Sequence, residues 1–209
     1  MRRRNIKDAA EKISNCKYVI TNIGDQHKKL TSLFENENPL HIEIGMGKGQ
    51  FLIQMALKHP DINFIGIEKY PSILVPATKK ISDLQITNIR FLCYDANNIL
   101  DLFNDNEIQR IYLNFSDPWT KSGHQKRRLS HSTFLEKYKK ILTNNGSIWL
   151  KSDNRNYFEF SITEIANFGF RLKNVCLDLH KSDFEDNVLT EYEEKFMNNG
   201  PIYRLEAYK

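Results

Sequence analysis

The stretch "LHIEIGMGKGQF", residues 40–51, joins an apolar run to a glycine-rich turn and then to the start of a helical pattern. Apolar residues continue at helical spacing as far as Ala56, and His59 with Pro60 ends the pattern. A strand, a glycine turn and a helix in immediate succession are typical of the first βα unit of a parallel α/β sheet. This stretch therefore indicates the fold class.

The rest of the chain repeats this alternation of strand and helix patterns. Segments rich in β-branched and aromatic residues, which predict strands, lie at 63–68, 89–95, 108–115 and 147–152. Helical spacing is clearest at 133–142 and 155–168, and a closing antiparallel strand pair is predicted at 170–180 and 201–208. The order predicts an α/β fold with a doubly wound, mainly parallel sheet of seven strands, with helices on both faces.

Two helices carry more detailed predictions. In the segment 133–142, Thr133 and Glu136 have the spacing of a capping box, and Gly146 stands where a helix terminator is expected. Pro76 falls inside the helical pattern after the strand at 63–68. We therefore expect that helix to begin later than its pattern, or to kink at the proline.

Length and composition indicate a globular protein of 209 residues, 40% of them hydrophobic. Residues 1–36 form a polar, basic leader that is expected to be partly helical or mobile, and residues 37–209 are expected to form a single domain. No run of about 18 apolar residues occurs and no apolar segment follows the basic start, so we expect no membrane span, no signal peptide and a cytoplasmic location. The three cysteines lack metal-ligand spacing, so no metal site is expected.

The positive charge of the chain is concentrated in one place. Residues 120–128 contain four Lys or Arg and no acid, so the remainder holds 26 basic and 26 acidic residues, and the whole net charge of +4 can be assigned to this loop. Such a loop is either a solvated connector or a surface for nucleic acid.

The glycine turn favours one cofactor over another. Dinucleotide sites use Gly-x-Gly-x-x-Gly, whereas here Gly45, Gly47 and Gly49 alternate and position 50 is Gln. Glu43 stands two residues before the first glycine, where it would repel a pyrophosphate but suit a cation. S-adenosylmethionine carries an ammonium and a sulfonium and no phosphate, so the turn favours S-adenosylmethionine over NAD.

Polar residues follow the later strands, at the edge where ligands bind in such sheets. Glu68 can accept from both ribose hydroxyls, and Asp95 or Asn97 can accept from an adenine amino group. In "SDPW", residues 116–119, proline stiffens the backbone between the acid Asp117 and an indole, which suits a purine. Asp153 adds an acid at the same edge, whereas the charged segment "TEYEEKF", residues 190–196, indicates only a solvated face by its spacing.

Five collinear motifs resemble those of one family: "EIGMGKGQF", "GIEKY", "NFSDPWTKSGHQKRRL", "KSDN" and "TEYEEKF". From about residue 40 onwards the sequence resembles the bacterial tRNA (guanine-N7-)-methyltransferases, which have a Rossmann-like, S-adenosylmethionine-dependent methyltransferase fold. The resemblance implies methyl transfer to N7 of a guanosine in tRNA, at position 46 in the variable loop. It implies a monomer or homodimer with tRNA as partner, S-adenosylmethionine as cofactor and no metal.

The resemblance also assigns roles to residues. It implies that Asp117 is the catalytic acid and that the cofactor is contacted by Glu43, Gly45, Gly47, Gly49, Glu68, Asp95, Asn97 and Asp117. It implies substrate binding by Lys121, Asp153, Thr190, Glu191, Tyr192 and Glu193. It implies RNA contact by Gly123, His124, Gln125, Lys126, Arg127 and Arg128.

The loop departs from the family pattern at two positions. The family usually has Asp-Pro-Trp-Pro-Lys followed by Arg-His, whereas this chain has Thr120 in place of the second proline and Gly123 in place of the arginine. We expect a looser loop with one phosphate contact fewer.

The expected chemistry needs no general base, because N7 of neutral guanine carries a lone pair and no proton. Asp117, Asp153, Glu191 and Glu193 are candidates to accept hydrogen bonds from guanine N1–H and the 2-amino group. Three alternatives stay open: a methyltransferase for exocyclic amines, which the "SDPW" turn also resembles, a non-catalytic RNA-binding protein with this fold, and an NAD-dependent dehydrogenase.

Overall fold

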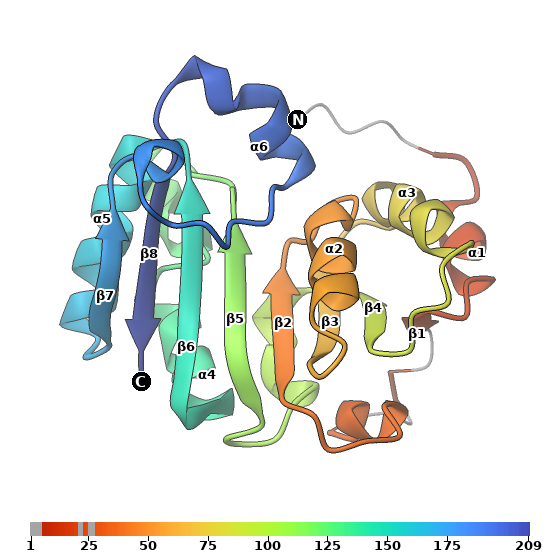
Figure 1. Cartoon of the computed structure of the whole chain (residues 1–209). Coiled ribbons are helices and arrows are strands. Elements are labelled where there is room, and N and C mark those ends of the chain that lie inside the picture. The colour runs from red at the N-terminus through yellow and green to blue at the C-terminus, as the bar shows by residue number, and fades with distance from the viewer. Residues whose placement is uncertain (1–5, 21–22, 25–27) are drawn as a thin grey trace. The chain divides into compact units, whose positions relative to one another are not determined.

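A computed structural model describes residues 6–20, 23–24 and 28–209 (Figure 1). The chain forms two compact units, Met1–Asn104 and Asp105–Lys209. The basic cluster at residues 2–4 lies outside the described residues.

Unit 1 is built on four parallel strands. They pair in the order β1-β4-β3-β2, with Ile44 of β2 opposite Ile67 of β3, and Glu68 of β3 opposite Cys93 of β4. The strands are β1 (Val19–Ile20), β2 (Leu40–Ile44), β3 (Asn63–Glu68) and β4 (Ile89–Cys93). The helices are α1 (Ala9–Ser14), α2 (Gln50–Lys58), α3 (Pro71–Ile81) and the short 3-10 helices η2 (Leu30–Leu33) and η3 (Ala96–Asp101).

The stretch at residues 40–51 folds as its pattern predicts. β2 is buried along its whole length, and α2 begins directly after Gly49 with a buried face that includes Phe51, Leu52 and Met55. Burial of this face stabilises the helix against the sheet, because each large apolar side chain contributes about 1.5–3 kcal/mol when fully buried.

Unit 1 corrects one alternative for α3 and adds a strand. α3 does not begin late, because Pro71 occupies its first turn, where the missing N–H of a proline costs no helical hydrogen bond. Pro76 lies inside the helix, and the alternative of a kink there stays a prediction. The leader also supplies a strand, since β1 pairs in parallel with β4 and the backbone N–H of Phe91 donates to the carbonyl of Tyr18 at 2.8 Å.

Unit 2 has four strands of mixed direction (Figure 1). β5 and β6 are parallel, and β8 is antiparallel to both β6 and β7, which confirms the predicted closing pair. The strands are β5 (Ile108–Asn114), β6 (Leu142–Ser152), β7 (Arg171–Cys176) and β8 (Tyr203–Tyr208). The helices are α4 (Ser132–Ile141), α5 (Arg155–Asn167), α6 (Glu191–Phe196) and the 3-10 helices η4 (Ser122–Arg127), η5 (Leu179–Lys181) and η6 (Met197–Asn199).

The ends of α4 correct two predictions. The N-cap is His131, whose ring accepts from the Thr133 N–H at 3.2 Å, and not Thr133 in a capping box. Gly146 does not terminate the helix, because α4 passes directly into β6 at Leu142 and Gly146 lies inside that strand. An imidazole nitrogen can replace the usual hydroxyl or carboxylate cap because it is also a hydrogen-bond acceptor.

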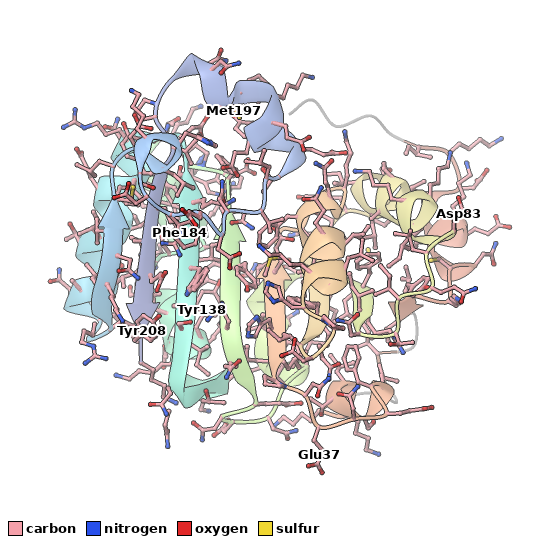
Figure 2. The ribbon with its side chains drawn as sticks, viewed as in Figure 1. Glu37, Asp83, Tyr138, Phe184, Met197 and Tyr208 are labelled. Carbon is pink, nitrogen blue, oxygen red and sulfur yellow. The ribbon has the colours of Figure 1, made fainter. Side chains whose placement is uncertain are left out.

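The two faces of the unit 2 sheet are covered differently. α4 and α5 lie behind the strands in Figure 1, whereas the segment that carries Phe184 crosses in front of β6 and β8 in Figure 2. Phe184 packs there against Trp149 of β6, with ring centroids 6.4 Å apart. α6 lies beyond the carboxyl ends of β5 and β6, where the sequence places its candidate site residues (Figure 1).

The described residues contain eight strands, one more than expected, because β1 comes from the leader. Within this part of the chain, no helix is both long and apolar enough to cross a membrane.

Candidate active site

The glycine turn of unit 1 adopts a conformation that favours glycine. Gly45, Gly47 and Gly49 have φ values of 78°, 58° and 74°, in the left-handed region where a side chain is strained. The backbone N–H groups of Gly45 and Met46 donate to the carbonyl of Ile67 at 2.8 and 3.2 Å, which ties the turn to the end of β3.

The three glycines have different surroundings. A Cβ on Gly49 would lie 2.8 Å from Met46 Cε and 3.0 Å from Ala77 Cβ, so this glycine permits close packing. A Cβ on Gly45 or Gly47 would meet nothing within 4 Å. The backbone at Gly45 and Gly47 is therefore open to close approach by a ligand, as the motif predicts.

Carboxylates lie near this turn. Glu68, at the end of β3 and 7% exposed, accepts from the Gly47 N–H at 3.2 Å through Oε2 and from the Tyr70 N–H at 3.1 Å through Oε1. These two bonds fix the orientation of the carboxylate at the strand end. Glu43 is buried in β2, two residues before Gly45.

The third acidic position, after β4, has a structural task as well. Asp95 Oδ1 accepts from both the backbone and the side-chain nitrogen of Asn97, at 3.0 and 2.8 Å, and thereby caps η3. Lys69 Nζ lies 2.6 Å from Asp95 Oδ2. The pKa of Asp95 is lowered: partial burial acts to raise it, but the hydrogen bonds from Lys69 and Asn97 outweigh that effect. Asp95 and Asn97 therefore lie side by side after β4, as the sequence predicts, and the lowered pKa favours the ionised form of the Asp95 carboxylate.

In unit 2, the turn after β5 is strained on both sides of Asp117. Phe115 and Trp119 have φ values of 50° and 42°, which for residues other than glycine cost on the order of 1–3 kcal/mol each. Strain of this kind persists only where surrounding contacts hold it, and it concentrates at functional sites. The Asp117 side chain is exposed at the centre of this turn.

The basic loop folds back onto the turn. The ring of His124 meets the Trp119 indole edge-on with centroids 5.8 Å apart, and the Arg127 guanidinium lies 5.0 Å from the indole centroid. Lys121, Gly123, Gln125, Lys126 and Arg127 are exposed. The expectation of a looser loop at Thr120 and Gly123 is not tested by these contacts and stays a prediction.

Arg128 differs from the rest of the loop. It is 6% exposed, donates from Nε to the Pro118 carbonyl at 2.8 Å and from Nη2 to the Trp119 carbonyl at 3.3 Å, and lies 4.3 Å from the Phe160 ring centroid. The sequence places Arg128 with the RNA contacts, whereas in the structure its guanidinium faces the turn, because that turn presents two carbonyls for the guanidinium fork.

Asp153 and Tyr192 form a pair within unit 2. The Tyr192 hydroxyl donates to Asp153 Oδ2 at 2.8 Å, and the Tyr192 ring packs on Phe115 with centroids 5.0 Å apart. Burial, together with the hydrogen bond to Asp153 and its charge, raises the pKa of Tyr192 to about 12. The "KSDN" and "TEYEEKF" motifs therefore meet beside the strained turn, which spacing alone does not indicate.

Glu193 is fully buried, although the sequence includes it among the acids that could accept from guanine. Its carboxylate accepts from Lys151 Nζ at 2.6 Å and from Asn187 Nδ2 at 2.8 Å, and His180 Nε2 lies 3.2 Å away. Glu193 also completes a capping box with Thr190 at the start of α6. The buried network occupies both carboxylate oxygens, so Glu193 does not offer a free edge to a base.

Lys151 lies at the centre of this network, although no role was predicted for it from the sequence. Lys151 is 5% exposed at the end of β6, and its ammonium also donates to Asn187 Oδ1 and to the Val188 carbonyl at 3.1 and 3.0 Å. A lysine in an otherwise apolar strand pattern is the signal that could have indicated a buried acid nearby, because buried charges are usually paired.

Comparison with known proteins shows the family to which this chain belongs. A family model described as "Putative methyltransferase" matches residues 37–205. Two curated relatives, the tRNA (guanine-N(7)-)-methyltransferases of Streptococcus pneumoniae strains CGSP14 and Hungary19A-6, are each 49% identical to this chain over 209 residues and 99% of both chains. The chain belongs to the bacterial tRNA (guanine-N7-)-methyltransferase family. This confirms the resemblance, and the similarity includes the leader, which the motifs do not cover.

Solved structures confirm the fold of the methyltransferase. An antibiotic-related methyltransferase matches with a TM-score of 0.63 and 20% identity over 86% of this chain and 91% of that chain. A SAM dependent methyltransferase from Aquifex aeolicus matches with a TM-score of 0.56 and 14% identity over 97% of this chain and 98% of that chain. The Rossmann-like methyltransferase fold predicted from the sequence is therefore correct.

The unit 1 strand ends of the methyltransferase fit S-adenosylmethionine. Gly45 and Gly47 leave open space at the backbone, and Glu68 presents an oriented carboxylate that suits ribose hydroxyls. Among the described residues, no group of three or more His, Cys, Asp or Glu side chains could hold a metal ion.

Proposed function

We propose that this protein transfers the methyl group of S-adenosylmethionine to N7 of a guanosine in tRNA, at position 46 in the variable loop, in the cytoplasm. The observation that carries the proposal is the strained turn around Asp117, to which an exposed basic loop is attached through Trp119. The 49% identity to enzymes named for this reaction supports it.

Unit 1 supplies the proposed cofactor site. Glu68 would accept from the ribose hydroxyls, Asp95 and Asn97 would contact the adenine, and Gly45 and Gly47 would let the backbone approach the ligand. Glu43 would complement the positive charge of the methionine part. When bound, S-adenosylmethionine supplies an electrophilic methyl group on a sulfonium.

Unit 2 supplies the proposed guanine site. The exposed carboxylates of Asp117 and Asp153, with Glu191, would accept from guanine N1–H and the 2-amino group. A carboxylate in this position also stabilises the positive charge that the base gains as N7 is alkylated. N7 loses no proton, so the chain needs to align the base and not to deprotonate it, and alignment alone can contribute several kcal/mol.

The exposed part of the basic loop supplies the proposed tRNA contact. Lys121, Lys126 and Arg127 would bind phosphates, and the backbone of Gly123 would permit close approach. Selection of one guanosine would come from tRNA shape and from which base can be presented unstacked.

One experiment tests the proposal directly. The protein is incubated with methyl-labelled S-adenosylmethionine and bulk tRNA that lacks its modifications, and the tRNA is digested to nucleosides. Label in 7-methylguanosine supports the proposal, and label in any other nucleoside, or none, contradicts it.

A second candidate is methylation of an exocyclic amine, which the "SDPW" turn favours by its likeness to the turns of such enzymes. Transcripts that contain 7-deazaguanosine lack N7 and keep the 2-amino group. An N7 enzyme loses activity on them, whereas an amine enzyme keeps it.

A non-catalytic RNA-binding protein would need no intact cofactor turn, and here Gly45, Gly47 and Glu68 are intact.

A further inference from the structure

We infer that Arg128 is a positioning residue that holds the Asp117 turn in its active conformation, and that it is not a phosphate ligand. The inference rests on the proposed function, because it assigns Arg128 a part in that reaction.

The side chain of Arg128 is committed to the turn. Its guanidinium donates to two consecutive carbonyls, those of Pro118 at 2.8 Å and Trp119 at 3.3 Å, and is stacked 4.3 Å from the Phe160 ring centroid. With 6% of its surface exposed, Arg128 cannot reach a phosphate unless these bonds break. A guanidinium carries several N–H donors fixed in one plane, so it can bridge two carbonyls with little loss of freedom, whereas the ammonium of lysine lacks this planar fork.

The turn needs such a clamp. Trp119 has a φ of 42° and Phe115 a φ of 50°, so both ends of the turn are strained. Pro118 has no N–H, which removes one backbone donor from the segment. The N–H of Phe115 bonds to the Lys151 carbonyl at 2.8 Å, which fixes the start of the turn, and Arg128 fixes its end. Asp117 lies between these two fixed points.

The run "KRR", residues 126–128, therefore divides into two functions. Lys126 and Arg127 are exposed, and Arg127 covers the Trp119 indole at 5.0 Å. Arg128 is buried and bonded to the backbone of the turn. The motif thus joins Lys126 and Arg127, which would bind RNA, to Arg128, which bonds to the Asp117 turn. Arg128 would therefore fix the position of the basic loop relative to this turn.

The test separates positioning from RNA binding by replacing Arg128 with lysine, which keeps the charge. We expect Arg128→Lys to lower kcat about 10- to 100-fold, since displacement of a reacting group by about 1 Å can cost this much. The Kd for tRNA and its salt dependence should stay within about twofold of wild type. A raised Kd with unchanged kcat would overturn the inference.

Arg204→Lys is the matched control. Arg204 is also buried in unit 2 and stacked on a phenylalanine, 3.8 Å from the Phe184 ring centroid, but it bonds to Glu206 and not to the turn. A comparable loss of kcat in Arg204→Lys would show that any buried arginine has this effect, and would contradict a specific role for Arg128.

Two further measurements distinguish positioning from a general loss of folding. In Arg128→Ala, guanidinium ion at non-denaturing concentration should restore part of kcat, and no restoration in a variant with a native circular dichroism spectrum would count against the inference.

In a Trp149→Phe background, the remaining Trp119 should show a shifted emission maximum when Arg128 is replaced by lysine. This shift does not require activity, so it tests the clamp even if the proposed methyl transfer is wrong; an unshifted spectrum would show that Arg128 does not hold the turn.

Discussion

At the scale of single residues, the proposed chemistry depends most on the Asp117 carboxylate. Because its side chain is exposed, Asp117→Asn should leave the melting temperature within about 2 °C of wild type, since surface substitutions usually change stability by less than about 0.5 kcal/mol. The loss of charge should lower kcat about 100-fold or more, as removal of a single electrostatic group in an active site does. Single-turnover methylation of tRNA measures the effect.

Asp105→Asn is a suitable control for Asp117, because Asp105 is also an exposed acid of unit 2. It should retain wild-type turnover. If Asp117→Asn were as active as this control, Asp117 would have no catalytic role.

The Tyr192–Asp153 pair gives a second prediction at this scale. The Tyr192 pKa of about 12, against 10.0 for the free side chain, should fall in Asp153→Asn because the acceptor loses its charge. Because the folded pKa is raised, the pair contributes stability in full below pH 10 and loses it as the pH rises through about 12. ¹³C NMR of labelled tyrosine, with Tyr192→Phe to assign the signal, measures the titration. An unchanged Tyr192 pKa in Asp153→Asn would show that burial alone causes the shift.

At the scale of elements, the buried Lys151–Glu193 pair anchors η5 and α6 to β6. Lys151→Met leaves the Glu193 carboxylate buried without its cation, which should cost about 3–5 kcal/mol of unfolding free energy. The double variant Lys151→Met with Glu193→Leu removes both charges and should be less destabilised than Lys151→Met alone. Urea denaturation measures both.

Lys140→Met, at an exposed position of α4, is the control for the loss of a lysine and should change the unfolding free energy by less than about 0.5 kcal/mol. Equal destabilisation of the single and double variants would mean that the ion pair is not what anchors α6.

Elements were predicted well where one signal dominated. β2 and β3 follow from short apolar runs that are buried along their whole length, and α2 follows from the helical spacing of its apolar residues directly after the glycine turn. β1 was missed because a strand of two residues, Val19 and Ile20, is too short to show an alternation of apolar and polar residues. Its pairing with β4, which defines it as a strand, cannot be seen in the sequence. The N-cap of α4 was predicted wrongly, because both His131 and Thr133 carry a hydrogen-bond acceptor and the structure uses His131.

Candidate site residues were predictable as positions but not as roles. Glu193 and Arg128 lie in the expected motifs, but both side chains are buried and bond to other parts of the protein. Their partners, Lys151 and the Pro118 carbonyl, cannot be identified from the motifs, because these contacts depend on how the chain folds. The charge of a residue in the sequence does not distinguish a side chain that binds a ligand from one that pairs with another group inside the protein.

At the scale of the whole molecule, the net charge of +4 is equal to the charge of residues 120–128, of which Arg128 is buried. If Lys126 and Arg127 each neutralise one phosphate, replacing both with alanine should lower the slope of log Kd against log salt by about 1.4–1.8, since each contact contributes about 0.7–0.9. Filter binding of tRNA at several salt concentrations measures this slope. Lys139→Ala with Lys140→Ala removes the same charge from an exposed position on α4 and should leave the slope nearly unchanged. Equal slopes in the two double variants would assign the salt dependence to net charge and not to the loop.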